Sequence, residues 1–383
     1  MKNKLRKLII GSFLAVAFTL YCIVYCVQAY KYAHVPIARI VLRKDQPGHP
    51  PEYVTGFSFS PDDRYVAAAE VNPDNLTVWH VPDLSPISTH PLGYVADHNS
   101  IAWMSNEKIQ VNTGTWFHFW AGEPSNAAHG QKEITEAAPW DFKEYRSVKV
   151  SPTGTMVAAG QDDGTLRLWY ASTAKYRILS HPPPYKVSHA GYQLIGFNFS
   201  PDSSTLIAAY TYESDYKISL DQQTTSYPND IEPVIIRLYD TKTGVLTRQW
   251  NWGAPWVGQI IPSNFGFAES PDSKQLAASC NGRLEIWDLQ SGRSLQKIDA
   301  AVGPELAFIP GKPLIAIDRS GIDVPDNEIQ IWKTNTGRPV QTFHESYYAD
   351  QIFAVSNDGR YMITESVDKI SNATLDLWDL SRL

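Results

Sequence analysis

The side chains best suited to metal chemistry are scattered along this sequence. Five histidines lie in connecting segments between apolar runs, and they are His90, His98, His181, His189 and His344. None of them has another histidine at position i+2 or i+4, so the local spacing of a metal site is missing. The sequence therefore predicts no metal ligands.

Motifs for covalent or phosphate chemistry are also missing. Cys280 stands alone within an apolar run, which favours a small core residue over a nucleophile. There is no Gly-x-Ser-x-Gly elbow, no phosphate-binding glycine loop and no Cys–His dyad signature. We therefore predict no catalytic residue and no cofactor, and we favour a protein that is not an enzyme.

Aromatic residues point instead to binding. They gather in four long connecting segments, residues 122–146, 181–193, 212–233 and 251–264. The candidate binding residues there are Trp140, Phe142, Tyr145, Tyr185, Tyr192, Trp252 and Trp256. Exposed aromatic clusters are typical of protein interaction sites, whereas the alternative is that these rings only pack the loops onto the scaffold.

The charge distribution bears on the kind of partner. The 383-residue chain has a formal net charge of −7. Four cations (Lys2, Lys4, Arg6 and Lys7) fall within its first seven residues, so the remainder carries −11. An acidic body without a run of lysine or arginine argues against nucleic acid and leaves a protein or peptide as the expected partner.

The N-terminus has the pattern of a membrane anchor. Residues 8–27 contain no charge, and a helix of that length spans the roughly 30 Å hydrocarbon core of a bilayer. We expect residues 1–7 to be a cytoplasmic basic stub, 8–29 a transmembrane signal anchor and 30–36 a linker. The alternative is a signal peptide cleaved after Ala29, which gives a secreted or periplasmic protein. Either way the remainder of the chain lies outside the cytoplasm.

The rest of the chain is a sevenfold repeat. Polar turns begin at Ser60, Ser105, Ser151, Ser200, Ser270, Ile309 and Ser356. Short runs with alternating polarity follow each turn, which predicts strands of antiparallel meanders. The aromatic residues expected to anchor the third strand of each unit are Trp79, Trp120, Trp169, Tyr239, Trp287, Trp332 and Trp378.

The sequence resembles the WD-repeat β-propeller family. The resemblance rests on the turns of Ser-Pro-Asp type, on the Trp-Asp pairs at Trp287 and Trp378, and on GQDDGTLRLWY around Trp169. It implies an all-β fold, a seven-bladed propeller of four-stranded antiparallel blades over residues 37–383, preceded here by the transmembrane helix. The chain departs from the family in lacking the Gly-His pair before each blade.

Residues 37–44 read as a strand outside any repeat, while the seventh repeat ends after its third strand. We expect residues 37–44 to close the ring as the outer strand of the last blade. The long segments then fall on one face, and we expect a membrane-tethered interaction scaffold that binds through this long-loop face. The alternative is an extracytoplasmic propeller enzyme (a hydrolase, lyase or quinoprotein-like protein) with a site at the mouth of the central channel.

Overall fold

The computed structural model describes the strands and most of the turns that join them. The described residues are 35–42, 53–71, 74–92, 101–112, 117–121, 132–136, 145–153, 155–161, 164–170, 175–180, 191–213, 234–252, 265–280, 282–319, 328–344, 353–367 and 373–383. Within these ranges the secondary structure consists of β-strands joined by turns, as the all-β prediction requires.

Four sheets each contain four strands that pair antiparallel in chain order. The first two comprise β2 (Tyr53–Phe59), β3 (Tyr65–Val71), β4 (Asn75–His80) and β5 (Pro86–Pro91), then β6 (Ile101–Ser105), β7 (Lys108–Asn112), β8 (Phe117–Ala121) and β9 (Lys132–Glu136). The next two comprise β10 (Tyr145–Val150), β11 (Met156–Gln161), β12 (Leu166–Tyr170) and β13 (Lys175–Ser180), then β14 (Gly191–Phe199), β15 (Thr205–Glu213), β16 (Val234–Asp240) and β17 (Leu246–Trp252).

A longer sheet contains seven strands in chain order. They are β18 (Phe265–Glu269), β19 (Gln275–Cys280), β20 (Gly282–Asp288), β21 (Ser294–Ile309), β22 (Leu314–Arg319), β23 (Glu328–Lys333) and β24 (Arg338–His344). The 16-residue strand β21 pairs with β20 through its first half and with β22 through its second half. Two four-stranded units thus share one strand.

The last sheet joins the two ends of the described chain. Its order is β1 (Ala38–Val41), β27 (Ala373–Asp379), β26 (Tyr361–Val367) and β25 (Phe353–Val355). The register pairs Ala38 with Leu377 and Val41 with Thr374. The N-terminal strand therefore completes the C-terminal sheet as its outer strand, as the sequence predicts; of the expected range 37–44, residues 43 and 44 lie outside the described ranges.

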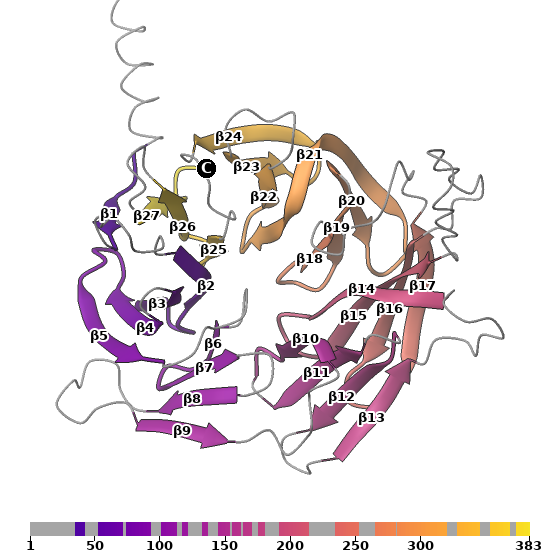
Figure 1. Ribbon diagram of the computed structural model, residues 1–383. Helices are drawn as coiled ribbons and strands as arrows, with labels where there is room; N and C mark the ends of the chain where they lie inside the picture. Colours follow the sequence, from indigo (N-terminus) through magenta and orange to yellow (C-terminus); the bar gives the residue numbers. More distant parts are fainter. Residues whose placement is uncertain are drawn as a thin grey trace, which may run out of the picture.

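The sheets stand around a common centre, with the first strand of each unit innermost and the fourth outermost (Figure 1). Apolar side chains fill the space between neighbouring sheets. For example, Leu206 and Tyr239 pack with Leu168, and Leu375 and Leu377 pack with Phe57. This radial arrangement of antiparallel sheets is that of a β-propeller.

The predicted long connection at residues 122–146 contains a strand. Residues 122–146 were expected to form a single long connection, but they contain β9, the outer strand of the β6–β9 sheet. Residues 122–131 therefore connect the third strand of a sheet to its fourth, as the short turns do in other sheets. The strand KEITE lacks the apolar run that marks other strands, because an outer strand buries little of either face.

The expected membrane anchor, residues 8–29, lies outside the described ranges, as do the stub and most of the linker. Among the residues that are described, no helix has the length and hydropathy needed to cross a bilayer.

Candidate functional site

The aspartates of the repeat turns are used to build the turns. Ser60, Ser200, Ser270 and Ser356 each donate a hydroxyl hydrogen bond of 2.6–2.7 Å to the aspartate two residues later. The same hydroxyl accepts the backbone N–H five residues on, at 2.8–3.0 Å. The hydrogen bond from Ser270 holds the pKa of Asp272 below its usual range. These carboxylates act as turn caps.

The same turns join neighbouring units. The carboxylate of Asp63 accepts the backbone N–H groups of Asn357 and Asp358 at 2.8 and 2.7 Å, which ties the first repeat to the last. Gly359 has φ +68°, and a β-carbon there would lie 2.2 Å from the carbonyl oxygen of Pro310. Only glycine allows this close approach between two turns.

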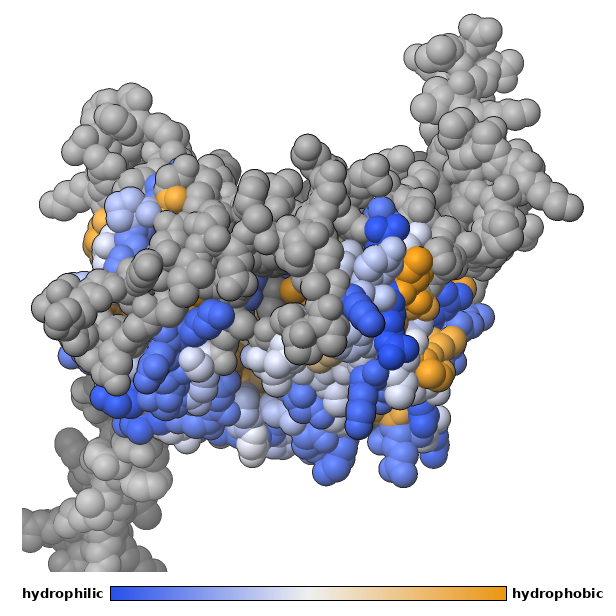
Figure 2. All heavy atoms as spheres, turned by 90° about the horizontal axis from the view of Figure 1, so that it is seen from below, coloured by the Kyte–Doolittle hydropathy of each residue, from blue (hydrophilic) through white to orange (hydrophobic). Residues whose placement is uncertain are grey.

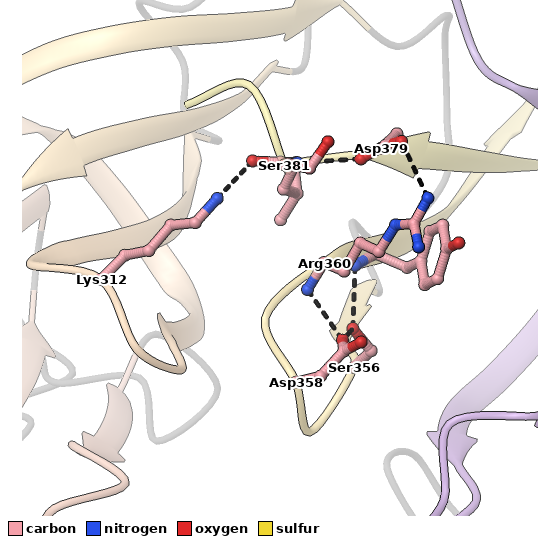
Figure 3. Close-up of polar contacts among 8 residues, drawn as sticks. Lys312, Ser356, Asp358, Arg360, Asp379 and Ser381 are labelled. Atoms are coloured by element: carbon pink, nitrogen blue, oxygen red, sulfur yellow. Dashed lines mark hydrogen bonds and ion pairs between the residues drawn. The ribbon is translucent and has the colours of Figure 1, made fainter.

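Figure 3 shows how the C-terminal turn is fixed. The Nζ atom of Lys312 donates to the carbonyl oxygen of Leu380 at 2.5 Å, and Arg360 forms an ion pair with Asp379 at 3.8 Å. The backbone N–H of Arg360 donates to Asp358 at 2.8 Å. These polar groups satisfy one another, so this part of the short-turn face serves structure.

The aromatic anchors predicted on the third strands lie at the ends of those strands. Trp79, Trp169, Tyr239, Trp287 and Trp378 are buried, and Trp332 is half-buried. The indole N–H of Trp378 donates to Thr364 at 3.1 Å, and that of Trp332 donates to Gln330 at 2.9 Å. Trp120 belongs to β8, but its side chain is outside the described part.

Trp252 needs a correction as a binding residue. It ends β17 instead of standing in a loop, and only 4% of it is exposed. Its ring lies edge-on to Trp287 at 5.3 Å and to Phe265 at 6.0 Å between centroids. A ring enclosed in the core cannot be presented to a partner, so Trp252 is a packing residue.

Two other predicted binding residues have a described backbone. Tyr145 is the first residue of β10, and Tyr192 is the second residue of β14. Both innermost strands start at the face opposite the turns at Ser151 and Ser200, so the two residues share that edge of the ring. Their side chains lie outside the described part, as do the whole of the other four candidates, Trp140, Phe142, Tyr185 and Trp256.

A pair of opposite charges on the inner strands was missed by sequence reasoning. Burial lowers the pKa of Lys149 on β10, and the negative charge of Glu305 on β21 opposes that shift. The two strands belong to different sheets of the ring. Neither residue is part of a motif, although the position of Lys149, two residues before Ser151, could have placed it on an inner strand.

The described residues offer neither a metal-binding cluster nor a reactive thiol. Within the described ranges, no group of three or more His, Cys, Asp or Glu side chains could hold a metal ion. Cys280 is buried, and burial raises the pKa of its thiol to about 11. Such a thiol stays protonated at neutral pH and is a core residue, as expected.

Comparison with known proteins agrees with this geometry. The family model "WD domain, G-beta repeat" matches residues 143–170, which covers β10, β11 and β12. A chain in the crystal structure of a mitotic checkpoint complex has the same fold, with a TM-score of 0.58 and 15% identity over 91% of this chain and 96% of that chain. These matches support a WD-repeat family.

A match to a curated protein covers a shorter part of the chain. The chain is 26% identical over 113 residues to U3 small nucleolar RNA-associated protein 12 of Saccharomyces cerevisiae. The match covers 29% of this chain and 11% of that protein. WD-repeat propellers are typically interaction scaffolds, and the family-model match is consistent with a protein-interaction scaffold.

Proposed function

We propose that this protein is a membrane-tethered WD-repeat scaffold that binds a protein or peptide through its long-loop face. The observation that carries the proposal is that the recurring turn aspartates and third-strand aromatics, where the structure describes them, are engaged internally. Turn aspartates cap turns, anchor aromatics are packed, and the cysteine is buried. What varies between repeats is the connections, and varied loops on a rigid scaffold commonly carry binding.

The ring is proposed to have seven blades. The strand β21 belongs to two units, so the seven-stranded sheet counts as two blades. With the four consecutive sheets and the sheet closed by β1, the count reaches seven. Each blade then begins with one of the seven turn-bearing repeats of the sequence.

The proposed orientation follows from the closing strand. Ile37 donates its backbone N–H to the carbonyl oxygen of Leu377 at 2.8 Å, so the chain enters β1 at the face where β27 ends. That is the short-turn face. A linker of seven residues reaches at most roughly 25 Å, so an anchor formed by residues 8–29 would keep this face toward the bilayer.

The test compares partners captured by three forms of the full-length protein. We expect replacement of Trp140, Tyr145, Tyr192 and Trp256 by alanine to remove the partners that are crosslinked to the wild type. The variant Lys274→Ala, on the short-turn face, should retain them. If the loop variant keeps every partner while Lys274→Ala loses them, the long-loop face is not the binding face. Trp252 is left unchanged because its loss would disturb the core.

A further inference from the structure

The outer strand β13 exposes an unusual series of side chains. Lys175, Tyr176, Arg177 and Ile178 follow one another, and all four are exposed, Tyr176 by 51% and Ile178 by 40%. Cations and apolar residues alternate, so the two kinds point to opposite sides of the strand. Since β13 is the last strand of its sheet, none of the strands in the described part of the chain pairs with its outer backbone edge.

Nearby groups hold Arg177 in place, and a further cation, Arg167 on β12, lies against Tyr176. The Nη1 atom of Arg177 donates to the carbonyl oxygen of Thr243 at 3.0 Å, and its guanidinium lies 5.8 Å from the centre of the Tyr170 ring. The guanidinium of Arg167 lies 5.4 Å from the centre of the Tyr176 ring. Stacked and hydrogen-bonded cations lose less entropy when they bind an anion.

The next sheet extends this surface with apolar residues. The turn at Gly244 lies against Arg177, because a β-carbon added to Gly244 would be 3.0 Å from the Cδ atom of Arg177. Val245 and Leu246, which follow the turn, are 59% and 43% exposed. Figure 2 views the side on which β8, β9, β12 and β13 lie in Figure 1, and it shows hydrophobic patches beside hydrophilic ones toward the right.

The charge of this surface contrasts with the whole protein. Residues 164–180 and 234–252 contain six Lys or Arg residues and one acid, Asp240. The chain as a whole has more acids than bases. A local basic excess favours an acidic partner and disfavours a symmetric contact in which this surface meets the same surface of a second copy.

We propose that the free edge of β13 pairs with an extended, acidic segment of a partner protein. The segment adds a strand to the sheet through backbone hydrogen bonds. Its carboxylates face Lys175 and Arg177, and its alternate apolar residues face Tyr176 and Ile178. Because cationic and apolar side chains alternate along β13, acidic and apolar side chains must alternate along the partner segment. This second interaction surface lies on the rim of the ring and is independent of the long-loop face.

The test uses a fluorescein-labelled peptide of about six alternating glutamate and valine residues, a common strand length. Fluorescence anisotropy with the full-length protein in detergent should show binding. Lys175→Glu with Arg177→Glu should weaken it by about tenfold or more, since like charges then face each other. The matched control, Arg293→Glu with Arg338→Glu, reverses two exposed cations where other outer strands begin, directly before β21 and at the first residue of β24, and should bind like the wild type.

A charge swap keeps the test independent of folding defects. A peptide of alternating lysine and valine should bind the reversed variant better than it binds the wild type. A glutamate–valine peptide that is N-methylated at alternate residues should lose binding, because its backbone cannot pair. Equal binding of the methylated peptide, or of polyglutamate, would overturn the proposal.

Binding of the rim to other anions is a separate outcome. If phosphatidylserine vesicles or single-stranded DNA bind more tightly than the peptide, and lose affinity in the same reversed variant, the rim recognises a different anion and the proposal is wrong. The variants of Tyr145 and Tyr192 should leave peptide binding unchanged. Loss of partners through the long-loop face is therefore distinguishable from loss through β13.

Discussion

Glu269 occupies a position that other repeats fill with an apolar residue. It is the last residue of β18, directly before the turn serine, where the equivalent Phe59 and Phe199 are buried. Its Oε2 atom is buried without a hydrogen-bond partner. Burial raises the pKa of Glu269 to about 7, the hydrogen bond with Ser273 opposes the shift, and the charge of Asp202 adds to it.

This raised pKa predicts a loss of stability with increasing pH. The unfolded chain releases the proton of Glu269 near the ordinary pKa of about 4.3, whereas the folded protein keeps it up to about 7. The free energy of unfolding therefore falls from pH 5 toward pH 8. Glu269→Gln should remove this dependence. The effect of the substitution on the free energy of unfolding should be more favourable at pH 8 than at pH 5 by about 1–2 kcal/mol, a value that allows for the partial solvent contact of Glu269.

Thermal unfolding of both forms between pH 5 and 8 measures the effect. Asp272→Asn is the matched control, because hydrogen bonds hold the pKa of Asp272 low and its charge does not change in this range. The control should be destabilised to the same extent at each pH. If Glu269→Gln follows the pH dependence of the wild type, Glu269 is ionised in the folded protein at pH 5.

A second prediction concerns the contribution of Trp252 to stability. Its ring contacts Trp287 and Phe265 in the core between the β14–β17 sheet and β18–β20. Trp252→Ala should lower the free energy of unfolding by about 3–5 kcal/mol, because it removes a large buried ring and leaves a cavity. Tyr176→Ala, which shortens an exposed aromatic, should change it by less than about 0.5 kcal/mol. Denaturant unfolding midpoints compare the two, and equal midpoints would show that Trp252 is not a core residue.

Among the elements, the closing strand β1 has few residues with which to hold the ring. The strand has four residues, and a bidentate ion pair strengthens it: Arg39 Nε and Nη2 contact the two carboxylate oxygens of Asp376 at 2.5 and 2.6 Å. Asp376 is almost completely buried, so loss of Arg39 would leave its carboxylate in the core without this partner.

We predict a coupling energy of about 1–3 kcal/mol between Arg39 and Asp376 in a double-mutant cycle with alanine. The exposed pair Lys274–Asp272, at 3.1 Å, provides the control and should couple by about 0.5 kcal/mol or less. Thermal unfolding of the single and double variants gives both values. A coupling energy for Arg39–Asp376 no larger than that of the control pair would mean that the ion pair does not contribute to closure.

Sequence reasoning succeeded for elements that repeat and failed for elements that do not. The turn serines and third-strand aromatics recur with a fixed spacing, so they located the strands around Trp169 and Trp287. The incomplete last repeat also predicted β1, because a propeller cannot leave one sheet without its outer strand. By contrast, β9 has a mostly polar sequence, and the burial of Trp252 depends on Trp287, a residue 35 positions away that no local pattern connects to it.

At the scale of the whole molecule, the two faces of the ring differ in chemistry. Short turns, satisfied hydrogen bonds and both described chain ends occupy one face, and the first residues of the innermost strands lie at the other. Strands of about six residues separate the faces by roughly 20 Å. If residues 8–29 form the proposed anchor, the distance of each face from the lipid is a measurable consequence of the position of β1.

Single fluorophores test that orientation. Cys280 is buried and has a raised pKa of about 11, so it should not react with maleimide, and Cys22 and Cys26 can be replaced by alanine. A fluorophore at Lys274→Cys marks the short-turn face, and one at Tyr53→Cys, the exposed first residue of β2, marks the opposite face. In vesicles containing an acceptor lipid, energy transfer should be higher from position 274 than from position 53. Higher transfer from position 53 would reverse the orientation, and equal, negligible transfer from both would show that residues 8–29 do not hold the ring at the membrane.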